Sequence, residues 1–451
     1  MLCAVLGLCS CAVSWSNPQA APEWTTGFWF WGGKPASASL SDEPDVLFVH
    51  VGTISKEESR WSLRSSQNPW HVVGQWPDDL PAAKEYWLVY RYEKQAVPEA
   101  VVAPLLADEV ARLLRVARTR RLAVRGVQLD IDSPSSRLLE YAAFLRGFRK
   151  ALPKDCQLSI TALLDWFRNG TAIEKVIQVA DEFVPQFYDA EPEQFRQQGS
   201  IATLVDADRW GPVFNRFGKR FRIGISSFGR ARIVHNEVPA AARYLGLGMF
   251  GDLAPIDVAT NPDFRLETKR TRAEEVVLTY RAARKIEIDY SKFNAGEGVQ
   301  FTLATPESVR DAVDRARQMK GNLAGVVFFR WPNEEEKLAM RPQEVLVAGG
   351  LSSTKDPQTD RIDLIDGRCA AVQCMDVYFS AAAPFAETTT RYRIRASGEL
   401  EYFLPEKSLP VRMRGQSELE LAVPPYCGRG HLYLGRAVSA RRVKFSVEEA
   451  R

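Results

Sequence analysis

The sequence predicts an α/β protein, in which an irregular (β/α)8 barrel is followed by a small, sandwich-like all-β domain. Eight short apolar runs are spread over the first three-quarters of the chain, and amphipathic helical segments lie between several of them. After about residue 340 the helical pattern stops and short alternating runs begin. The chain has 451 residues, of which 45% are hydrophobic and 25% charged, so it is long enough for both parts.

The apolar runs are near-continuous rather than alternating, and they are rich in β-branched and aromatic residues. Runs of this kind are typical of parallel strands that are buried on both faces, as in a TIM barrel. The segment between the first two runs is too short for a good helix, so we expect the barrel to be irregular there. The runs lie at residues 27–31, 45–52, 85–92, 126–132, 157–163, 182–188, 221–228 and 324–331.

Helices are predicted between several of these strands. Residues 105–121 and 137–150 place apolar side chains at helical spacing, with charged side chains on the opposite side. Thr305 and Pro306 are typical of an N-cap and a first helical turn, so a third helix is expected to run from there to about residue 319.

The barrel is predicted to occupy residues 23–340, with a long insertion at about 231–305 before the last strand. Residues 298–304 indicate an extra strand inside this insertion. Residues 341–361 have the composition of a linker, and residues 362–451 form the predicted β-domain.

Residues 1–22 have the features of a leader and tether. The apolar segment 2–13 has the length of a signal-peptide core and is too short to span a bilayer. Leu8-Cys9-Ser10-Cys11 resembles a bacterial lipobox, in which Cys11 would carry the lipid; an ordinary secretory signal is the alternative. We therefore expect an exported protein, either periplasmic or a membrane-anchored lipoprotein, and leave its oligomeric state open.

Outside the leader the chain has four cysteines, and their pairing stays open. Cys156, Cys369, Cys374 and Cys427 allow three disulfide pairings. The last three, together with His431, instead approximate the ligand set of a zinc site. Export favours disulfides or buried thiols, so we expect no metal and no cofactor.

The charge pattern argues against several classes of partner. The formal net charge is +3, and the two signs are interspersed, so a nucleic-acid partner has no electrostatic support. Four histidines without an H-E-x-x-H motif argue against a multi-histidine metal centre, and no phosphate-binding loop is present.

The richest candidate site ends the fourth predicted strand. Gln128, Asp130 and Asp132 alternate along it, so they share one face, and in a barrel that face is the interior. Two carboxylates this close cannot both ionise freely, so we expect one raised pKa, as a general acid needs. The alternative is that Asp132 caps the following turn, which explains one aspartate but not the whole set. His50 and Arg91 are expected to be strand-end polar residues rather than catalytic groups.

Residues 125–132 (RGVQLDID) resemble the strand-four motif of family-18 chitinases, D-G-x-D-x-D-x-E. The resemblance implies that Asp132 stands at the catalytic glutamate and Asp130 at the aspartate that assists it. Arg125 and Gln128 depart from the motif, and Asp132 is one methylene shorter than glutamate.

Two further segments resemble the same family in the same order. Residues 186–189 (QFYD) are similar to its strand-six motif, which implies that Tyr188 and its neighbour position an N-acetyl group. Residues 224–230 (GISSFGR) are similar to its strand-seven motif, and Phe329 stands where the family has a sugar-stacking tryptophan. The expected substrate-binding residues are Gln128, Asp189, Trp29, Trp31, Arg230, Phe329, Arg330 and Trp331.

The chain as a whole resembles an uncharacterised bacterial family, the domain of unknown function 3142, which supports the fold and carries no established activity. Two hypotheses for function stay open. The first is a glycoside hydrolase that cleaves an amino-sugar-containing glycan, with Asp132 as the acid and Asp130 and Tyr188 assisting a substrate-assisted step. The second is a non-catalytic cell-envelope protein that binds a glycan or a partner protein on a degenerate glycosidase barrel.

Overall fold

The structure is a computed structural model of the chain. It describes residues 23–36, 43–56, 70–188, 205–234, 255–272, 275–288, 291–352, 359–381, 385–386, 388–406, 411–427 and 430–450. The leader with Cys11 and the candidate site residue Asp189 lie outside these ranges. In the described part of the chain, every helix is too short or too polar to cross a membrane.

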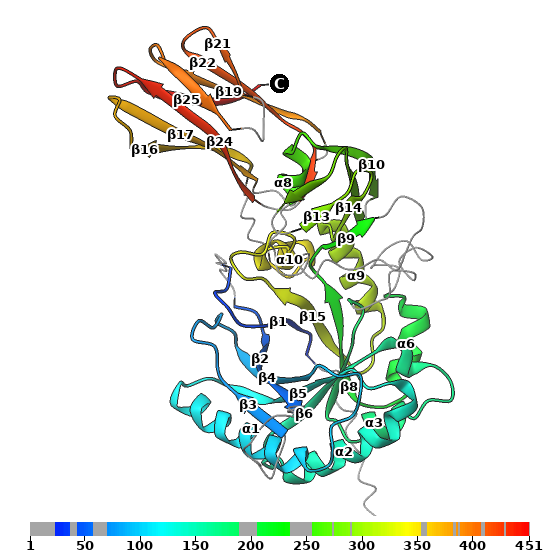
Figure 1. Cartoon of the computed structure of the whole chain (residues 1–451). Coiled ribbons are helices and arrows are strands. Elements are labelled where there is room, and N and C mark those ends of the chain that lie inside the picture. The colour runs from blue at the N-terminus through cyan, green and yellow to red at the C-terminus, as the bar shows by residue number, and fades with distance from the viewer. Residues whose placement is uncertain are drawn as a thin grey trace, which may run out of the picture.

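A closed barrel of eight parallel strands forms the centre of the described chain (Figure 1), which confirms the predicted fold. The ring closes because β1 pairs with both β2 and β15. Each predicted apolar run overlaps one of the strands. They are β1 (Thr25–Phe30), β2 (Val46–Lys56), β4 (Glu85–Tyr92), β5 (Val124–Ile131), β6 (Gln157–Ala162), β7 (Glu182–Pro185), β8 (Arg220–Ser226) and β15 (Leu323–Trp331).

The first part of the barrel is irregular. The described residues between β1 and β2 contain no helix. After β2 the chain forms β3 (Trp70–Gly74), which pairs with β2 in antiparallel orientation before the parallel order resumes at β4. The barrel wall is thus extended here by one antiparallel strand.

Helices cover the outside of the remaining barrel (Figure 1). Their apolar faces are buried against the strands, as Leu106 and Val110 of α1 illustrate. Thr305 caps α9 by accepting a hydrogen bond from the Ser308 amide, at 3.0 Å, as the sequence predicted. These helices are α1 (Val102–Thr119), α2 (Leu138–Ala151), α3 (Ile173–Ile177), α6 (Ala207–Asn215) and α9 (Pro306–Gln318), with short turns η1 (Ser135–Arg137) and η2 (Leu164–Phe167).

A further helix lies within the expected linker at 341–361. Helix α10 (Pro342–Ala348) packs against α9, and its Val345 and Leu346 are buried in the main core. Pro342 in the first turn and the apolar pair after it favour a helix with one buried face. Residues 342–348 therefore form part of the barrel's outer layer.

The insertion before β15 forms a small sheet of its own. Within the described residues the strand order is β10-β11-β14-β9, all antiparallel, and β14 (Gly298–Leu303) is the extra strand expected at 298–304. Phe264, Tyr280 and Phe301 lie in its separate apolar core. The other elements are β9 (Arg230–Val234), α8 (Pro255–Thr260), β10 (Phe264–Arg272), β11 (Glu275–Ala282), β12 (Ile286–Ile288) and β13 (Ser291–Phe293).

The C-terminal part is all-β, as predicted, and packs against the insertion (Figure 1). Among its described residues, two four-stranded antiparallel sheets share one core, which Ile256 of α8 also enters. One sheet orders β16 (Arg361–Gly367), β17 (Gln373–Ala381), β24 (Gly430–Ser439) and β20 (Tyr402–Pro405). The other orders β21 (Val411–Arg414), β22 (Glu418–Val423), β19 (Thr390–Ala396) and β25 (Phe445–Ala450), and β18 (Phe385–Ala386) pairs with β23 (Tyr426–Cys427).

The structure decides the pairing of two of the four cysteines. Cys369 and Cys374 form a disulfide, so their sulfurs are bonded to each other and the four-ligand zinc arrangement is not formed. Cys156 is a buried free thiol, and burial raises its pKa to about 11. Across the described ranges, no group of three or more His, Cys, Asp or Glu side chains is arranged to hold a metal ion.

Candidate active site

Asp130 is a buried carboxylate held from the neighbouring strands. Its side chain is 5% exposed. It accepts hydrogen bonds from Arg91 Nη1 at 3.0 Å, Thr161 Oγ1 at 2.8 Å and Gln186 Nε2 at 3.2 Å. These donors come from β4, from β6 and from the residue after β7, so the barrel's parallel register brings them to one point. The side chain of Asp130 therefore points into the barrel, as predicted.

Asp132 lies two residues further along the chain, directly after the end of β5, and closer to solvent. Its side chain is 26% exposed, and Arg91 Nη2 lies 3.8 Å from its Oδ2. Burial alone would lower the pKa of Arg91, but Asp130 and Asp132 together raise it, so the guanidinium stays charged. Asp130 and Asp132 therefore share Arg91 as a cationic neighbour.

Gln128 is buried beneath this pair, and its side chain makes hydrogen bonds inside the barrel. Its Oε1 accepts a hydrogen bond from Trp29 Nε1 at 2.7 Å, and its Nε2 donates to Ser159 Oγ at 3.0 Å. Both Gln128 and Trp29 are almost completely buried. Trp29 in turn packs on Phe48, which stacks on Trp87, and these rings fill the middle of the barrel. The structure therefore places Gln128 and Trp29 below the site, out of a substrate's reach.

Tyr188 and Phe329 form the aromatic side of the cluster. Their rings are stacked, with centroids 4.5 Å apart and an interplanar angle of 11°. Tyr188 also meets Trp29 edge-on at 5.2 Å, and its carbonyl accepts a hydrogen bond from the Arg230 guanidinium. Gly224 makes this packing possible, because a Cβ there would lie 2.9 Å from Tyr188 Cε1.

Trp31 links the aromatic side to the carboxylates. Its ring stacks on His50 with centroids 4.6 Å apart, and the Arg91 guanidinium lies 5.2 Å from the ring centre. Phe329 meets it edge-on at 5.9 Å. Burial lowers the pKa of His50; Asp130 opposes this shift and Arg91 adds to it. Both Arg91 and His50 were expected to be strand-end polar residues. Arg91 joins the cluster because it lies directly opposite Asp130 on the neighbouring strand, a register that no local signal in the sequence gives.

Arg330 and Trp331 do not join this cluster. Arg330 is buried in an ion pair with Glu336. Trp331 packs edge-on against Phe28 in the outer core, with centroids 5.4 Å apart, and donates to the Ala36 carbonyl at 3.3 Å. Of the candidates on β15, only Phe329 therefore lies with Tyr188 and Trp31.

Solved structures that are similar to this chain have low sequence identity to it. The spore cortex-lytic enzyme SleL of Bacillus cereus is 10% identical; the match covers 74% of this chain and 76% of that one, at a TM-score of 0.41. A chitinase from Rhizomucor miehei is 11% identical, with 72% and 99% covered and a TM-score of 0.40. The class V chitinase of Nicotiana tobaccum is 12% identical, with 73% and 99% covered and a TM-score of 0.39. The barrel fold itself rests on the strand pairing described above.

A comparison with curated proteins found no match to the chain. The part of the barrel that matches a family model contains β5, Asp130, Asp132 and Tyr188. Residues 91–242 match the model of the family described as Domain of unknown function (DUF3142), which confirms the resemblance to that family predicted from the sequence.

Proposed function

We propose that this protein is a glycoside hydrolase that cleaves an amino-sugar-containing glycan, with Asp132 as the proton donor. The observation that carries the proposal is the different burial of two carboxylates, one at the end of β5 and one directly after it. Asp130 is buried and held by its donors, whereas Asp132 is partly exposed at the carboxyl end of β5. In (β/α)8 barrels, catalytic groups stand at this end of the strands.

The proposed reaction follows the substrate-assisted scheme implied by the resemblance to family-18 chitinases. Asp132 donates its proton to the glycosidic oxygen as the bond to the anomeric carbon breaks, and the substrate's N-acetyl oxygen attacks that carbon. Water then hydrolyses the cyclic intermediate and Asp132 takes a proton back. Asp130 stabilises the positive charge that develops on the N-acetyl group, and Tyr188 donates a hydrogen bond to it.

Arg91 supports a second candidate function. A guanidinium close to two carboxylates favours their ionised forms, and an ionised Asp132 has no proton to donate. Under this hypothesis the barrel is a non-catalytic, exported cell-envelope protein that binds a glycan or a partner protein, and Arg91 and Asp132 contact the ligand. Export and a lipid anchor at Cys11 are part of both proposals.

The test is reducing-end release from chitin oligomers, peptidoglycan, poly-N-acetylglucosamine and plain glucans. Asp132→Asn is compared with Asp108→Asn, which makes the same change on the exposed side of α1. For a hydrolase we expect the wild type and Asp108→Asn to turn over one of the amino-sugar glycans, and Asp132→Asn to be slower by at least about 100-fold. Thermal unfolding of each variant checks that the fold is intact.

The outcomes separate the two functions. Turnover that is unchanged in Asp132→Asn contradicts the role of Asp132. No turnover by the wild type on any glycan, together with saturable binding of one of them, supports the non-catalytic hypothesis.

A further inference from the structure

A polar pocket of about 390 Å³ lies at the end of the barrel opposite the candidate active site. It is lined by the first residues of the barrel strands, among them Thr25, Val46 and Glu182. The stacked rings of Phe48 and Trp87 fill the barrel between this pocket and the catalytic end. Residues at this face of (β/α)8 barrels ordinarily serve stability, and they close the barrel with packed side chains. Stability of the barrel alone therefore does not account for an open pocket lined by charged residues at this face.

The floor of the pocket holds a buried ion pair with an unused acceptor. Glu182 and Arg222 pair with each other, and their side chains are 3% and 2% exposed. Arg222 Nε also donates to Thr25 Oγ1 at 3.1 Å. Within the described residues, Glu182 Oε1 is buried and has no hydrogen-bond partner. A buried carboxylate oxygen in this state is a strong acceptor for a donor that enters the pocket.

The rim of the pocket carries cations whose charge is only weakly balanced by nearby carboxylates. Arg220 lies 4.0 Å from Glu182 Oε2, and its side chain is 45% exposed. Arg125 is exposed and has no ion-pair partner in the part of the chain that the structure describes. Burial and then Arg222 lower the pKa of Arg220, Glu182 and Glu85 oppose this shift, and Arg125 adds to it, so Arg220 is repelled by both neighbouring guanidinium groups. By contrast, Lys84 is paired with Asp45 at 2.8 Å.

We propose that this pocket binds a small hydroxy-carboxylate, such as a sugar acid. Its carboxylate lies between Arg125 and Arg220, which relieves the repulsion between the cations, and one of its hydroxyls donates to Glu182 Oε1. A hydroxyl suits this acceptor better than an ammonium group, because Arg222 lies beside it and repels a positive charge. Trp24 Nε1 is a further buried donor without a partner among the described residues, and it lines the same pocket.

The probe is D-glucuronate, titrated calorimetrically into the purified protein at 150 mM NaCl so that non-specific charge effects are screened. We expect saturable binding that is weakened at least about tenfold in the Arg125→Gln/Arg220→Gln variant. The matched control is Arg115→Gln/Arg118→Gln on the exposed side of α1, which removes the same charge elsewhere on the barrel. D-glucose lacks the carboxylate and acetate lacks the hydroxyls, so each is expected to bind at least about tenfold more weakly.

The proposal is overturned by the absence of saturable glucuronate binding, or by equal affinity in the Arg125→Gln/Arg220→Gln variant. Acetate binding as tightly as glucuronate would also overturn it, because the hydroxyl contact would then contribute nothing. The site uses no residue of the proposed active site. Glucuronate binding is therefore expected to persist in Asp132→Asn, so the outcome is independent of whether the protein hydrolyses glycans.

Discussion

The guanidinium of Arg91 lies between Asp130 of β5 and Asp132 directly after it, with Nη1 at 3.0 Å from Asp130 Oδ2 and Nη2 at 3.8 Å from Asp132 Oδ2. The shorter contact belongs to the buried carboxylate and the longer one to the exposed carboxylate. Asp130 is therefore held at a shorter distance from the guanidinium than Asp132, and both carboxylates have the same cation as a neighbour.

Replacing Arg91 by glutamine is expected to raise the pKa of the Asp132 carboxyl. The change removes an adjacent cation that favours the ionised form, so the titration midpoint should move to higher pH. Carbon-13 NMR of the labelled carboxyl groups measures this directly. In a hydrolase, the alkaline limb of the pH–rate profile should move to higher pH as well. Arg120→Gln, on an exposed position after α1, is the control, and equal midpoints in the two variants would contradict the electrostatic role of Arg91.

Gly224→Ala is expected to disturb the aromatic side of the site. The added Cβ would lie 2.9 Å from Tyr188 Cε1, 3.0 Å from the Pro185 carbonyl oxygen and 3.1 Å from Trp29 Cη2. Overpacking of this kind costs about 1–3 kcal/mol, and glycan binding or turnover should fall as Tyr188 moves. Urea unfolding followed by tryptophan fluorescence measures the free energy of unfolding.

Gly147→Ala on α2 is the matched control for this change. The nearest atom to its added Cβ is Ala103 Cβ at 3.8 Å, an ordinary contact. Alanine in a helix is more stable than glycine by about 0.5–1 kcal/mol, so this variant should be slightly more stable than the wild type. Equal effects of the two substitutions would show that the close packing at Gly224 does not matter.

His50 is expected to make the barrel less stable in acid. Its pKa is lowered by burial in the folded state, so between that value and about pH 6.5 the unfolded chain binds a proton that the folded chain does not. Stability from this group is complete above about pH 6.5 and is lost as the pH falls from there through the lower pKa of the folded state. The stability difference between the wild type and His50→Gln should therefore shrink on acidification. His71→Gln, on an exposed position of β3, should show no such trend, and parallel pH profiles for all three proteins would refute the assignment.

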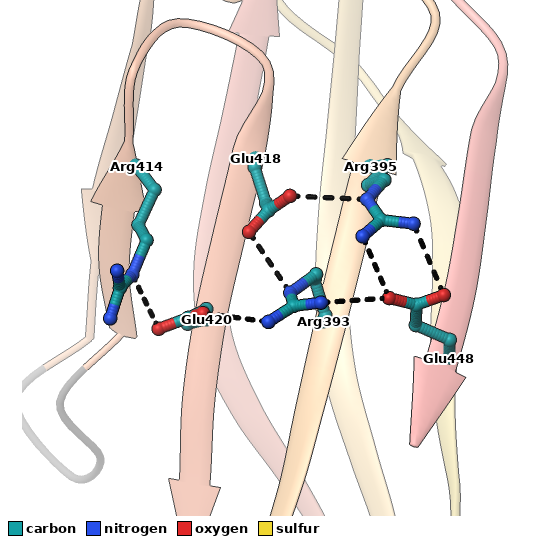
Figure 2. A network of polar contacts seen from close by, with 6 residues as sticks. All are labelled: Arg393, Arg395, Arg414, Glu418, Glu420 and Glu448. Atoms are coloured by element: carbon teal, nitrogen blue, oxygen red, sulfur yellow. Dashed lines mark hydrogen bonds and ion pairs between the residues drawn. The ribbon is translucent and has the colours of Figure 1, made fainter. Parts of the chain in front are cut away.

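A network of charged side chains spans the outer face of the sheet that contains β19 (Figure 2). Arg393 lies at its centre and pairs with Glu418 at 3.0 Å, Glu420 at 3.2 Å and Glu448 at 3.1 Å. Arg414 pairs only with Glu420 among the described residues, at 2.6 Å, and its side chain is 64% exposed.

Because Arg393 joins several carboxylates and Arg414 joins one, Arg393→Met is expected to lower the thermal midpoint more than Arg414→Met at low salt. The difference between the variants should narrow in about 1 M NaCl, where exposed charges are screened over a few ångströms. Calorimetry at the two salt concentrations measures both effects. A loss in Arg393→Met that does not depend on salt would indicate packing rather than charge as its cause.

Much of the fold could be predicted because a parallel barrel strand is buried on both faces and leaves a continuous apolar run in the sequence. The inward direction of Asp130 followed in the same way, from the two-residue period of a strand. Helix α10 was missed because a short helix with few buried residues gives too weak a periodic signal. Trp331 was expected in the site as an aromatic residue near a strand end, but it packs against Phe28 in the outer core.

The sequence by itself determined the eight barrel strands, the all-β end of the chain and the alternation of two aspartates at the end of the fourth predicted strand, because each of these depends on neighbours along the chain. Only the tertiary structure decided that Arg91 lies between those aspartates, and that Glu182 and Arg222 are buried together beneath the barrel. These pairs join residues about 40 positions apart on neighbouring strands. Which side chains meet across strands depends on the register and closure of the barrel, and no local pattern in the sequence encodes that register.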